Sequence, residues 1–468
     1  MTNAVTAALE YAKTHRSRFI DQLGELLAIP SVSTTPEHQA DIQKAAHWVA
    51  AYLEKIGLQN VQLYPPDSHP LVYGEDLRAG PEAPTVLVYG HYDVQPADPL
   101  EKWHTDPFKP VIREGQIYAR GATDNKGPFM AVLYALEAIL NNGQLPVNVK
   151  VMIEGQEEIG SSALAQFIAE NKKLLACDFC LNPDTGMLAP DLPTITYALR
   201  GLAYFELKVY GPAQDLHSGV FGGAVHNPAQ ALCELIAGMH DAHGRITLPG
   251  FYEDVRPLDE EERAELARIP FTEEMFQART GVPQVWGEPE FTFYERITAR
   301  PTLEINGLYS GFIEAGAKTV LPAYALAKIS CRLVPDQDPA KIKTCLETYL
   351  SENAAATIRW ELTELVHGAA SISDRHSPWV RAMQKAQETV WGVRPAFKRE
   401  GGSVPVVTQL QQILGVDSVN VGCALPDDNM HGPNEKMNLA VWEKSLASYI
   451  HFFYNLAGQG QAGEQVDR

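Results

Sequence analysis

The sequence predicts an α/β protein in which a mostly parallel sheet carries helices on both faces and a smaller α+β domain is inserted into the larger one. Apolar strand-like segments alternate with helical patterns up to about residue 181, and the same texture returns after about residue 370. Between these stretches the strands change to alternating apolar and polar positions. A chain of 468 residues also exceeds the length that a single hydrophobic core usually serves.

The larger domain is expected to occupy residues 1–197 and 369–468, and its elements follow one another as strand and helix. The segment TVLVYGH at 85–91 has the continuous apolar character of a strand that is buried on both faces. Further strands are expected at 147–153, 178–181 and 417–421, and helices at 127–140, 161–175, 377–391, 404–414 and 439–455. This alternation is typical of parallel strands joined by covering helices.

The inserted domain is expected to occupy residues 198–368. Its strands have one apolar and one polar face, which is typical of a sheet that is covered on one side only. They are expected at 202–210, 302–306 and 326–334, with helices at 227–240 and 339–353. The charged stretch 252–300 is irregular and predicts no element.

Composition excludes several classes of protein. With 38 basic and 58 acidic residues the formal charge is −20, so the surface repels nucleic acids and anionic membranes. No apolar run approaches the roughly 18 residues of a membrane helix. The first residues lack the features of a signal peptide, so a cytoplasmic protein is expected. The CxxC formed by Cys177 and Cys180 lies in an apolar strand and has no second CxxC, which favours buried thiols over a zinc or redox site.

Side chains able to bind metals follow the predicted strands of the larger domain. They are His91 and Asp93 after TVLVYG, Asp124 in GATDNKG, Glu157 and Glu158 after VKVMIEG, Asp184 after the strand at 178–181, and His431 in the loop after VDSVNVG. In open α/β sheets, ligands bind outside the carboxyl ends of the strands. We therefore expect these side chains to converge on one crevice.

The residue types indicate the chemistry of that crevice. Imidazoles and carboxylates form a mixed nitrogen and oxygen set that suits zinc, manganese or cobalt better than calcium. Carboxylates so close together would repel one another unless cations neutralised them, and two divalent ions about 3.5–4 Å apart that share one carboxylate would do so. Taken singly, each residue also has a structural interpretation. For example, Asp124 could cap a helix and Asp184 could stabilise a turn.

Eight motifs occur in an order that resembles the M20 metallopeptidases, most closely the branch of cytosolic nonspecific dipeptidases and carnosinases. They are GHYDVQP, GATDNKG, EGQEEIGS, NPDTG, DLHSGVFGG, CRLVPDQ, EGGSVP and MHGPNEK, and the resemblance covers about residues 20–455. It implies a hydrolase that cleaves the amide bond of dipeptides or short peptides with two divalent metal ions, zinc first and manganese or cobalt as alternatives.

The resemblance also implies roles for single residues of the metal site. Asp124 would bridge both ions, with His91 and Asp184 completing the shell of one ion and Glu158 and His431 that of the other. Glu157 would be the general base, which takes a proton from the attacking water and passes it to the leaving amine. Asp93 would orient the His91 imidazole, because a metal-bound histidine usually donates its other N–H to such a partner.

Further implied roles fall on more distant residues. His217 would stabilise the oxyanion, reaching across from the partner subunit of a homodimer formed by the inserted lid and dimerisation domain. Arg332 would bind the carboxylate of the substrate. The substrate pocket would be lined by His367, Glu400, Gly402 and Ser403. Two alternatives stay open: a deacylase of N-acyl amino acids or a carboxypeptidase of the same family. A catalytically dead scaffold is disfavoured, because the expected ligands and Glu157 are all present.

Overall fold

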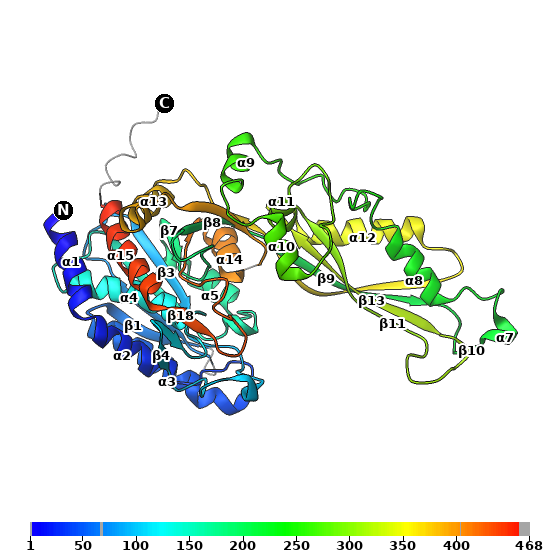
Figure 1. The fold of residues 1–468 in the computed structure, drawn as a ribbon, viewed down its shortest axis with the longest axis horizontal. Helices are drawn as coiled ribbons and strands as arrows, with labels where there is room; N and C mark the ends of the chain where they lie inside the picture. Colours follow the sequence, from blue (N-terminus) through cyan, green and yellow to red (C-terminus); the bar gives the residue numbers. More distant parts are fainter. Residues whose placement is uncertain (1, 66–68, 403, 458–468) are drawn as a thin grey trace. The chain divides into compact units, whose positions relative to one another are not determined.

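The structure, a computed structural model, describes residues 2–65, 69–402 and 404–457, and its chain divides into two compact units (Figure 1). The first unit comprises Met1–Tyr197, Ser373–Lys398 and Pro405–Arg468. The second comprises Ala198–Ile372 and Arg399–Val404. The α/β class predicted from the sequence is confirmed, with a large mixed sheet mainly in the first unit and a smaller α+β arrangement in the second unit.

The large sheet is mixed, and its parallel part is its centre. The parallel strands lie in the order β6 (Asn148–Glu154), β3 (Thr85–His91), β7 (Phe179–Asn182) and β17 (Ser418–Asn420). Antiparallel ladders extend it through β2 (Leu71–Asp76) and β1 (Gln59–Tyr64) on one side, and through β8 (Thr194–Leu199) and β15 (Ser371–Ile372) on the other; β16 (Ala396–Glu400) also pairs with β8. Nearly every residue of β3, β6 and β7 is buried, which explains why these strands are apolar without alternation.

Helices cover both faces of this sheet. Gly74 of β2 lies against Leu53 of α3 (Gln39–Lys55), whereas the hydroxyl of its neighbour Tyr73 donates to the main-chain oxygen of Leu174 in α6 (Lys172–Leu175). Successive side chains of a strand point to opposite faces, so α3 and α6 lie on opposite sides. The remaining helices are α1 (Thr2–Thr14), α2 (Arg16–Leu27), α4 (Lys126–Leu140), α5 (Leu164–Glu170), α13 (Pro378–Trp391), α14 (Pro405–Leu414) and α15 (Leu439–Leu456).

The single helix expected at 161–175 is wrong in detail, because the structure has two short helices there. The helix α5 ends at Glu170 and α6 begins at Lys172, and Asn171 between them has a φ of −115° and a ψ of 29°, which are not helical. Asparagine favours such interruptions because its side chain competes for main-chain hydrogen bonds, and here Asn171 Nδ2 donates to the Phe167 oxygen.

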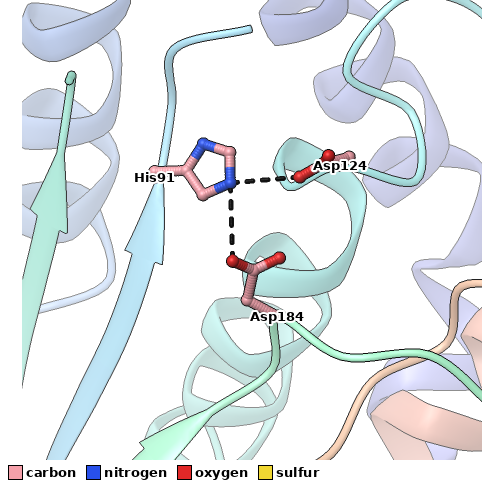
Figure 2. A group of neighbouring side chains, drawn as sticks. All are labelled: His91, Asp124 and Asp184. Atoms are coloured by element: carbon pink, nitrogen blue, oxygen red, sulfur yellow. Dashed lines mark hydrogen bonds and ion pairs between the residues drawn. The ribbon is translucent and has the colours of Figure 1, made fainter. Parts of the chain in front are cut away.

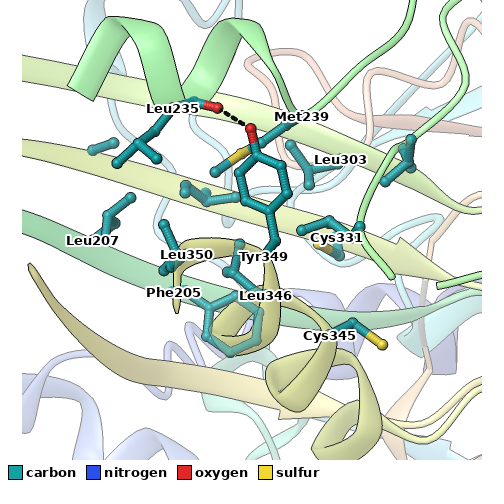
Figure 3. Close-up of a cluster of buried hydrophobic side chains, with 14 of the residues drawn as sticks. Phe205, Leu207, Leu235, Met239, Leu303, Cys331, Cys345, Leu346, Tyr349 and Leu350 are labelled. Atoms are coloured by element: carbon teal, nitrogen blue, oxygen red, sulfur yellow. Dashed lines mark hydrogen bonds between the residues drawn. The ribbon is translucent and has the colours of Figure 1, made fainter. Parts of the chain in front are cut away.

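The second unit is built on a four-stranded antiparallel sheet in the order β11 (Thr302–Ser310), β13 (Tyr324–Leu333), β9 (Gly201–Tyr210) and β14 (Arg359–Gly368). Along β9 buried and partly buried residues alternate. The buried face packs against α8 (Pro228–Ala237) and α12 (Pro339–Asn353), and Figure 3 shows this core. The Tyr349 hydroxyl donates to the main-chain oxygen of Leu235 at 2.8 Å, which joins the two helices. The sheet therefore keeps one face open, as its alternating strands predict.

The stretch 252–300, for which the sequence predicts no element, contains three short helices. They are α9 (Glu260–Leu266), α10 (Glu273–Thr280) and α11 (Phe293–Thr298). Asp259, Thr272 and Thr292 cap their first turns, and Thr292 forms a capping box with Glu295. Helices of one or two turns are too short to display an apolar period, so the capping residues were the only signal available.

Small elements complete the chain. The strands β4 (Val111–Arg113), β5 (Gln116–Tyr118) and β18 (Lys436–Asn438) form a separate sheet, and β10 (Leu216–His217), followed by α7 (Ser218–Phe221), pairs with β12 (Val320–Leu321). Within the described residues, no helix combines the length and the apolar character that a membrane span needs. Cys180 is buried in β7, Cys177 is half-buried, and the two thiols are unpaired.

Candidate metal centre

The predicted metal ligands all belong to the first unit, where the ends of the parallel strands position them. His91 is the last residue of β3, and Asp184 follows β7 by two residues. Asp124 lies just before α4, and Glu158 lies in the 3-10 turn Glu157–Ile159 that follows β6. His431 lies in the loop between β17 and β18. The structure thus brings side chains from distant parts of the sequence to one edge of the sheet.

These side chains form two triads that share Asp124. In the first triad, His91 Nε2 lies 3.1 Å from Asp124 Oδ1 and 3.6 Å from Asp184 Oδ2, as Figure 2 shows. In the second, His431 Nε2 lies 2.9 Å from Asp124 Oδ2 and 3.5 Å from Glu158 Oε2. Each oxygen of the Asp124 carboxylate therefore serves a different triad.

The spacing within the triads fits a small divalent cation. The ligand atoms of each triad lie within 4.8 Å of one another. With zinc–nitrogen and zinc–oxygen bonds of about 2.0–2.2 Å, neighbouring ligands of a tetrahedral shell are roughly 3.3–3.5 Å apart. The measured separations of 2.9–3.6 Å fall around that value, so both triads can hold an ion with little rearrangement.

Burial and repulsion between carboxylates raise the pKa values of Glu158 and Asp184. Burial, followed by repulsion from Asp124, raises the pKa of Glu158 to about 8, and burial raises the pKa of Asp184 to about 7. A hydrogen bond to Asp124 raises the pKa of His431 to about 9. Without cations, the centre therefore binds protons in their place near neutral pH.

Asp93 connects the His91 imidazole to the turn that carries the two glutamates. The Nδ1 atom of His91 lies 3.1 Å from the main-chain oxygen of Asp93 and 3.4 Å from its Oδ1. The same carboxylate accepts hydrogen bonds from the main-chain nitrogens of Glu157, at 3.2 Å, and Glu158, at 3.1 Å. Since Asp93 is fully buried, these bonds fix the imidazole with Nε2 directed toward Asp124.

Two residues that the sequence reasoning missed also hold ligands. Asn125 Nδ2 donates to Asp184 Oδ1 at 2.9 Å, and Gln95 Nε2 donates to Glu158 Oε2 at 2.7 Å. Both occur inside quoted motifs, GATDNKG and GHYDVQP. Their amides carry no metal-binding signal in the sequence, because amides of this kind only hold the carboxylates that would bind the ions.

Glu157 lies in the same 3-10 turn as Glu158 and is mostly buried beside both triads. Burial raises the pKa of its carboxyl, the charge of His91 opposes that effect, and the carboxylates of Asp124 and Asp93 add to it. A raised pKa brings a carboxylate closer to the range in which a general base works at neutral pH.

His217 lies in the second unit, exposed at the end of β10. Its Nδ1 accepts a hydrogen bond from the main-chain nitrogen of Gly219 at 3.0 Å. In the neutral imidazole the proton is therefore on Nε2, which can donate to a negatively charged oxygen.

Arg332 and His367 also belong to the second unit. Arg332, on β13, lies opposite Leu202 of β9, whereas His367, on β14, lies opposite Ala203. Residues 202 and 203 are neighbours on one strand, so the pleat directs Arg332 and His367 to opposite faces of the sheet. His367 Nδ1 contacts Glu364. The substrate-binding role of both residues stays a prediction.

The segment that contains Glu400 and Gly402 is held by its surroundings within the second unit. Arg200 donates from its main-chain nitrogen to the Glu400 oxygen and from Nε to the Gly401 oxygen, both at 3.2 Å. Next to Glu400, the buried Arg399 donates to Glu262 of α9 at 2.7 Å. The stretch 252–300 thus supports this segment. Ser403 lies outside the described residues.

The sequence matches the model of the Peptidase family M20/M25/M40 over residues 87–458. That range covers more than half of the chain and includes both triads. The chain belongs to this family. The M20 resemblance drawn from the sequence motifs is therefore confirmed.

Individual M20 relatives match nearly the whole chain. The Cys-Gly metallodipeptidase DUG1 of Saccharomyces cerevisiae is 33% identical over 97% of this chain and 99% of its own length. The Beta-Ala-His dipeptidase of Homo sapiens is 32% identical over 96% of this chain and 92% of its own. Both relatives are named for the hydrolysis of a dipeptide.

Solved structures show the same fold. The structure of the di-peptidase Dug1p from Saccharomyces cerevisiae matches with a TM-score of 0.78 at 30% identity, over 98% of this chain and 99% of that one. The M20 family metallo-carboxypeptidase Sso-CP2 from Sulfolobus solfataricus matches with a TM-score of 0.82 at 32% identity, over 94% and 99%.

Proposed function

We propose that this chain is a two-metal dipeptidase that hydrolyses the amide bond of dipeptides and short peptides. The observation that carries the proposal is the sharing of Asp124 between two triads, because a carboxylate with one oxygen in each triad can bridge two cations. Membership of the M20 family and the names of the two dipeptidase relatives supply the substrate class.

The chain's own residues would carry the proton transfers. When bound, two divalent cations would polarise the amide carbonyl and make the attacking water more acidic. The Glu157 carboxylate would accept a proton from that water as the oxygen of the water bonds to the carbonyl carbon. The same proton would pass to the amine nitrogen as the carbon–nitrogen bond breaks. Asp93 would hold the imidazole of His91 and the main chain of Glu157 in place during these steps.

Residues of the second unit would bind the rest of the substrate. The His217 Nε2–H would donate to the carbonyl oxygen as negative charge develops there. The planar guanidinium of Arg332 would bind the terminal carboxylate through two parallel hydrogen bonds. Glu400, Gly402 and Ser403 would line the pocket, and His367, which lies on the other face of the sheet from Arg332, stays a proposed pocket residue. We propose residues 198–368, which form most of the second unit, as the lid and dimerisation domain.

A panel of substrates tests this function. Dipeptides with a free amine and a free carboxylate should have a kcat/KM at least roughly 100-fold higher than that of N-acetyl or N-succinyl amino acids. An N-acyl substrate lacks the free amine and would leave the polar groups of the pocket that bind this amine without a partner. The measurement is amine release with zinc, manganese or cobalt added in turn. Turnover of N-acyl amino acids alone would exclude the dipeptidase.

A carboxypeptidase is the second candidate function, and the likeness to Sso-CP2 favours it. The same panel separates the two functions when it includes peptides of three to six residues. A dipeptidase loses activity as the chain lengthens, whereas a carboxypeptidase keeps it. The dipeptidase is preferred because both sequence relatives described above are named dipeptidases.

We propose that the second unit forms a homodimer through the surface beside His217. Val220 and Phe221, which are adjacent in α7, are 69% and 43% exposed. Adjacent exposed apolar side chains can mark a surface that binds another protein. In the proposed dimer, His217 would donate to the substrate bound at the partner's metal centre.

Replacing Phe221 by aspartate should therefore produce a monomer with much lower activity. Loss of one oxyanion donor lowers kcat by roughly 10²–10³-fold. Sedimentation velocity and kcat are the two measurements, and Val393→Asp, at a site 44% exposed in the first unit, is the control. A Phe221→Asp monomer with full activity would refute the cross-subunit role.

Zinc as the native metal and a cytoplasmic location stay predictions.

A further inference from the structure

Arg120 and Glu435 form a buried ion pair next to the loops that carry the metal ligands. The Nη1 atom of Arg120 lies 2.7 Å from Glu435 Oε2, and the two side chains are 1% and 0% exposed. Neither residue belongs to the triads. Buried charges need more than one partner to offset the loss of hydration, so their other hydrogen bonds show what the pair holds.

Glu435 binds the loop that leads into the shared ligand Asp124. Its Oε2 accepts from the main-chain nitrogen of Gly121 at 3.0 Å. Its Oε1 accepts from the main-chain nitrogens of Thr123 at 2.9 Å and of Asp124 itself at 3.2 Å. Three main-chain donors on one carboxylate fix the path of this loop up to the ligand.

Arg120 binds two further segments with its other terminal nitrogen. Its Nη2 donates to the main-chain oxygen of His431 at 3.1 Å and to that of Pro96 at 3.0 Å. His431 has a φ of 61°, in the left-handed region that side chains with a Cβ rarely adopt. The hydrogen bond to its carbonyl helps to hold the residue in that conformation. Pro96 follows Asp93 by three residues and so continues the segment that orients His91.

We infer that Arg120 and Glu435 are positioning residues that set the Asp124 carboxylate and the His431 imidazole at the separation a cation needs. The inference rests on the proposed two-metal function. The pair forms hydrogen bonds with the main chain of Asp124 and His431, the two members of the second triad that lie in loops. His91, the last residue of β3, and Asp184, two residues after β7, complete the first triad. Within the described residues, the hydrogen-bond partners of His91 and Asp184 do not include either member of the pair. The second cation site therefore depends on the pair more than the first.

The test is zinc binding by the full-length chain, measured by equilibrium dialysis of Arg120→Lys and Glu435→Gln. Lysine keeps the charge opposite Glu435 but cannot reach both carbonyl oxygens as a planar guanidinium does. The wild type should bind two zinc ions per chain. In Arg120→Lys the affinity for one ion should fall by roughly 10–100-fold, which is the usual effect of removing an outer partner of a ligand, while the other ion stays bound.

Glu137→Gln is the matched control. Glu137 is buried in the same unit and pairs with Arg18, but it bonds no ligand segment. It should lose stability and keep two-ion binding. Wild-type zinc binding by a folded Arg120→Lys chain would overturn the inference, as would an equal loss of both ions. If Glu435→Gln does not fold, Arg120→Lys decides alone. A wild-type chain that binds one ion overturns the two-metal function itself, together with this inference.

Discussion

Replacement of Glu157 by glutamine should abolish turnover and leave the metal content unchanged. A general base contributes roughly 10²–10⁴-fold to the rate of a proton-transfer step, and the amide of glutamine cannot accept the proton. The side chain keeps its size, and the main-chain hydrogen bond from residue 157 to Asp93 needs no carboxylate at position 157. The loss should therefore appear in kcat and not in binding.

Two measurements check this prediction together, namely kcat on a dipeptide and zinc content by elemental analysis. Glu170→Gln is a suitable control, because Glu170 is exposed on α5 and belongs to neither triad. Unchanged kcat in Glu157→Gln would remove Glu157 as the base. A loss of zinc in the same variant would instead make Glu157 a ligand.

Replacement of Asp124 by asparagine should remove both metal ions at once. Each oxygen of this carboxylate lies in a different triad, at 3.1 Å from His91 and 2.9 Å from His431. Asparagine has one acceptor oxygen and no negative charge, so one triad loses its shared ligand atom and the other keeps only a neutral one. The affinity for both ions should fall by more than the roughly 10–100-fold that follows when a residue hydrogen-bonded to a metal ligand is replaced. Asp184→Asn is the contrast, since it belongs to the first triad only.

Zinc content and thermal stability, measured together, test this prediction. Ligands that bind only the folded state stabilise it by about 2.7 kcal/mol at a concentration of 100 Kd, so the Asp124→Asn chain should lose the rise in Tm that zinc gives the wild type. One zinc ion retained at wild-type affinity would show that Asp124 does not bridge the two sites.

The same centre should bind metal more weakly as the pH falls. Without cations, the pKa of Glu158 is about 8 and that of Asp184 is about 7, so both carboxyls gain protons as the pH drops through this range. Protons and cations compete for the same oxygens. Dialysis of the wild type against zinc at pH 8 and at pH 6 should therefore give the higher content at pH 8.

Local pattern was enough to predict the four parallel strands at the centre of the large sheet. The segment at 85–91 is an unbroken apolar run and forms β3 over the same residues. The antiparallel flanks of the sheet were not foreseen, because a strand's direction depends on its neighbours and not on its own composition. The three short helices of 252–300 were missed for a different, local reason, because each is too short to show the apolar period of a helix.

The sequence by itself determined which chemical groups the centre contains and where each follows a strand. His91 ends β3 and Asp184 follows β7 because residues after parallel strands reach the same edge of a sheet. Motif order alone also identified the M20 family.

Only the tertiary structure decided how those groups are arranged. It showed that Asp124 divides its two oxygens between the triads and that Asp93 connects His91 to Glu157. It also showed the pair of Arg120 and Glu435, residues 315 positions apart in the chain. Such contacts join segments without a common local pattern, because the energy of a buried hydrogen bond depends on where folding places its two partners.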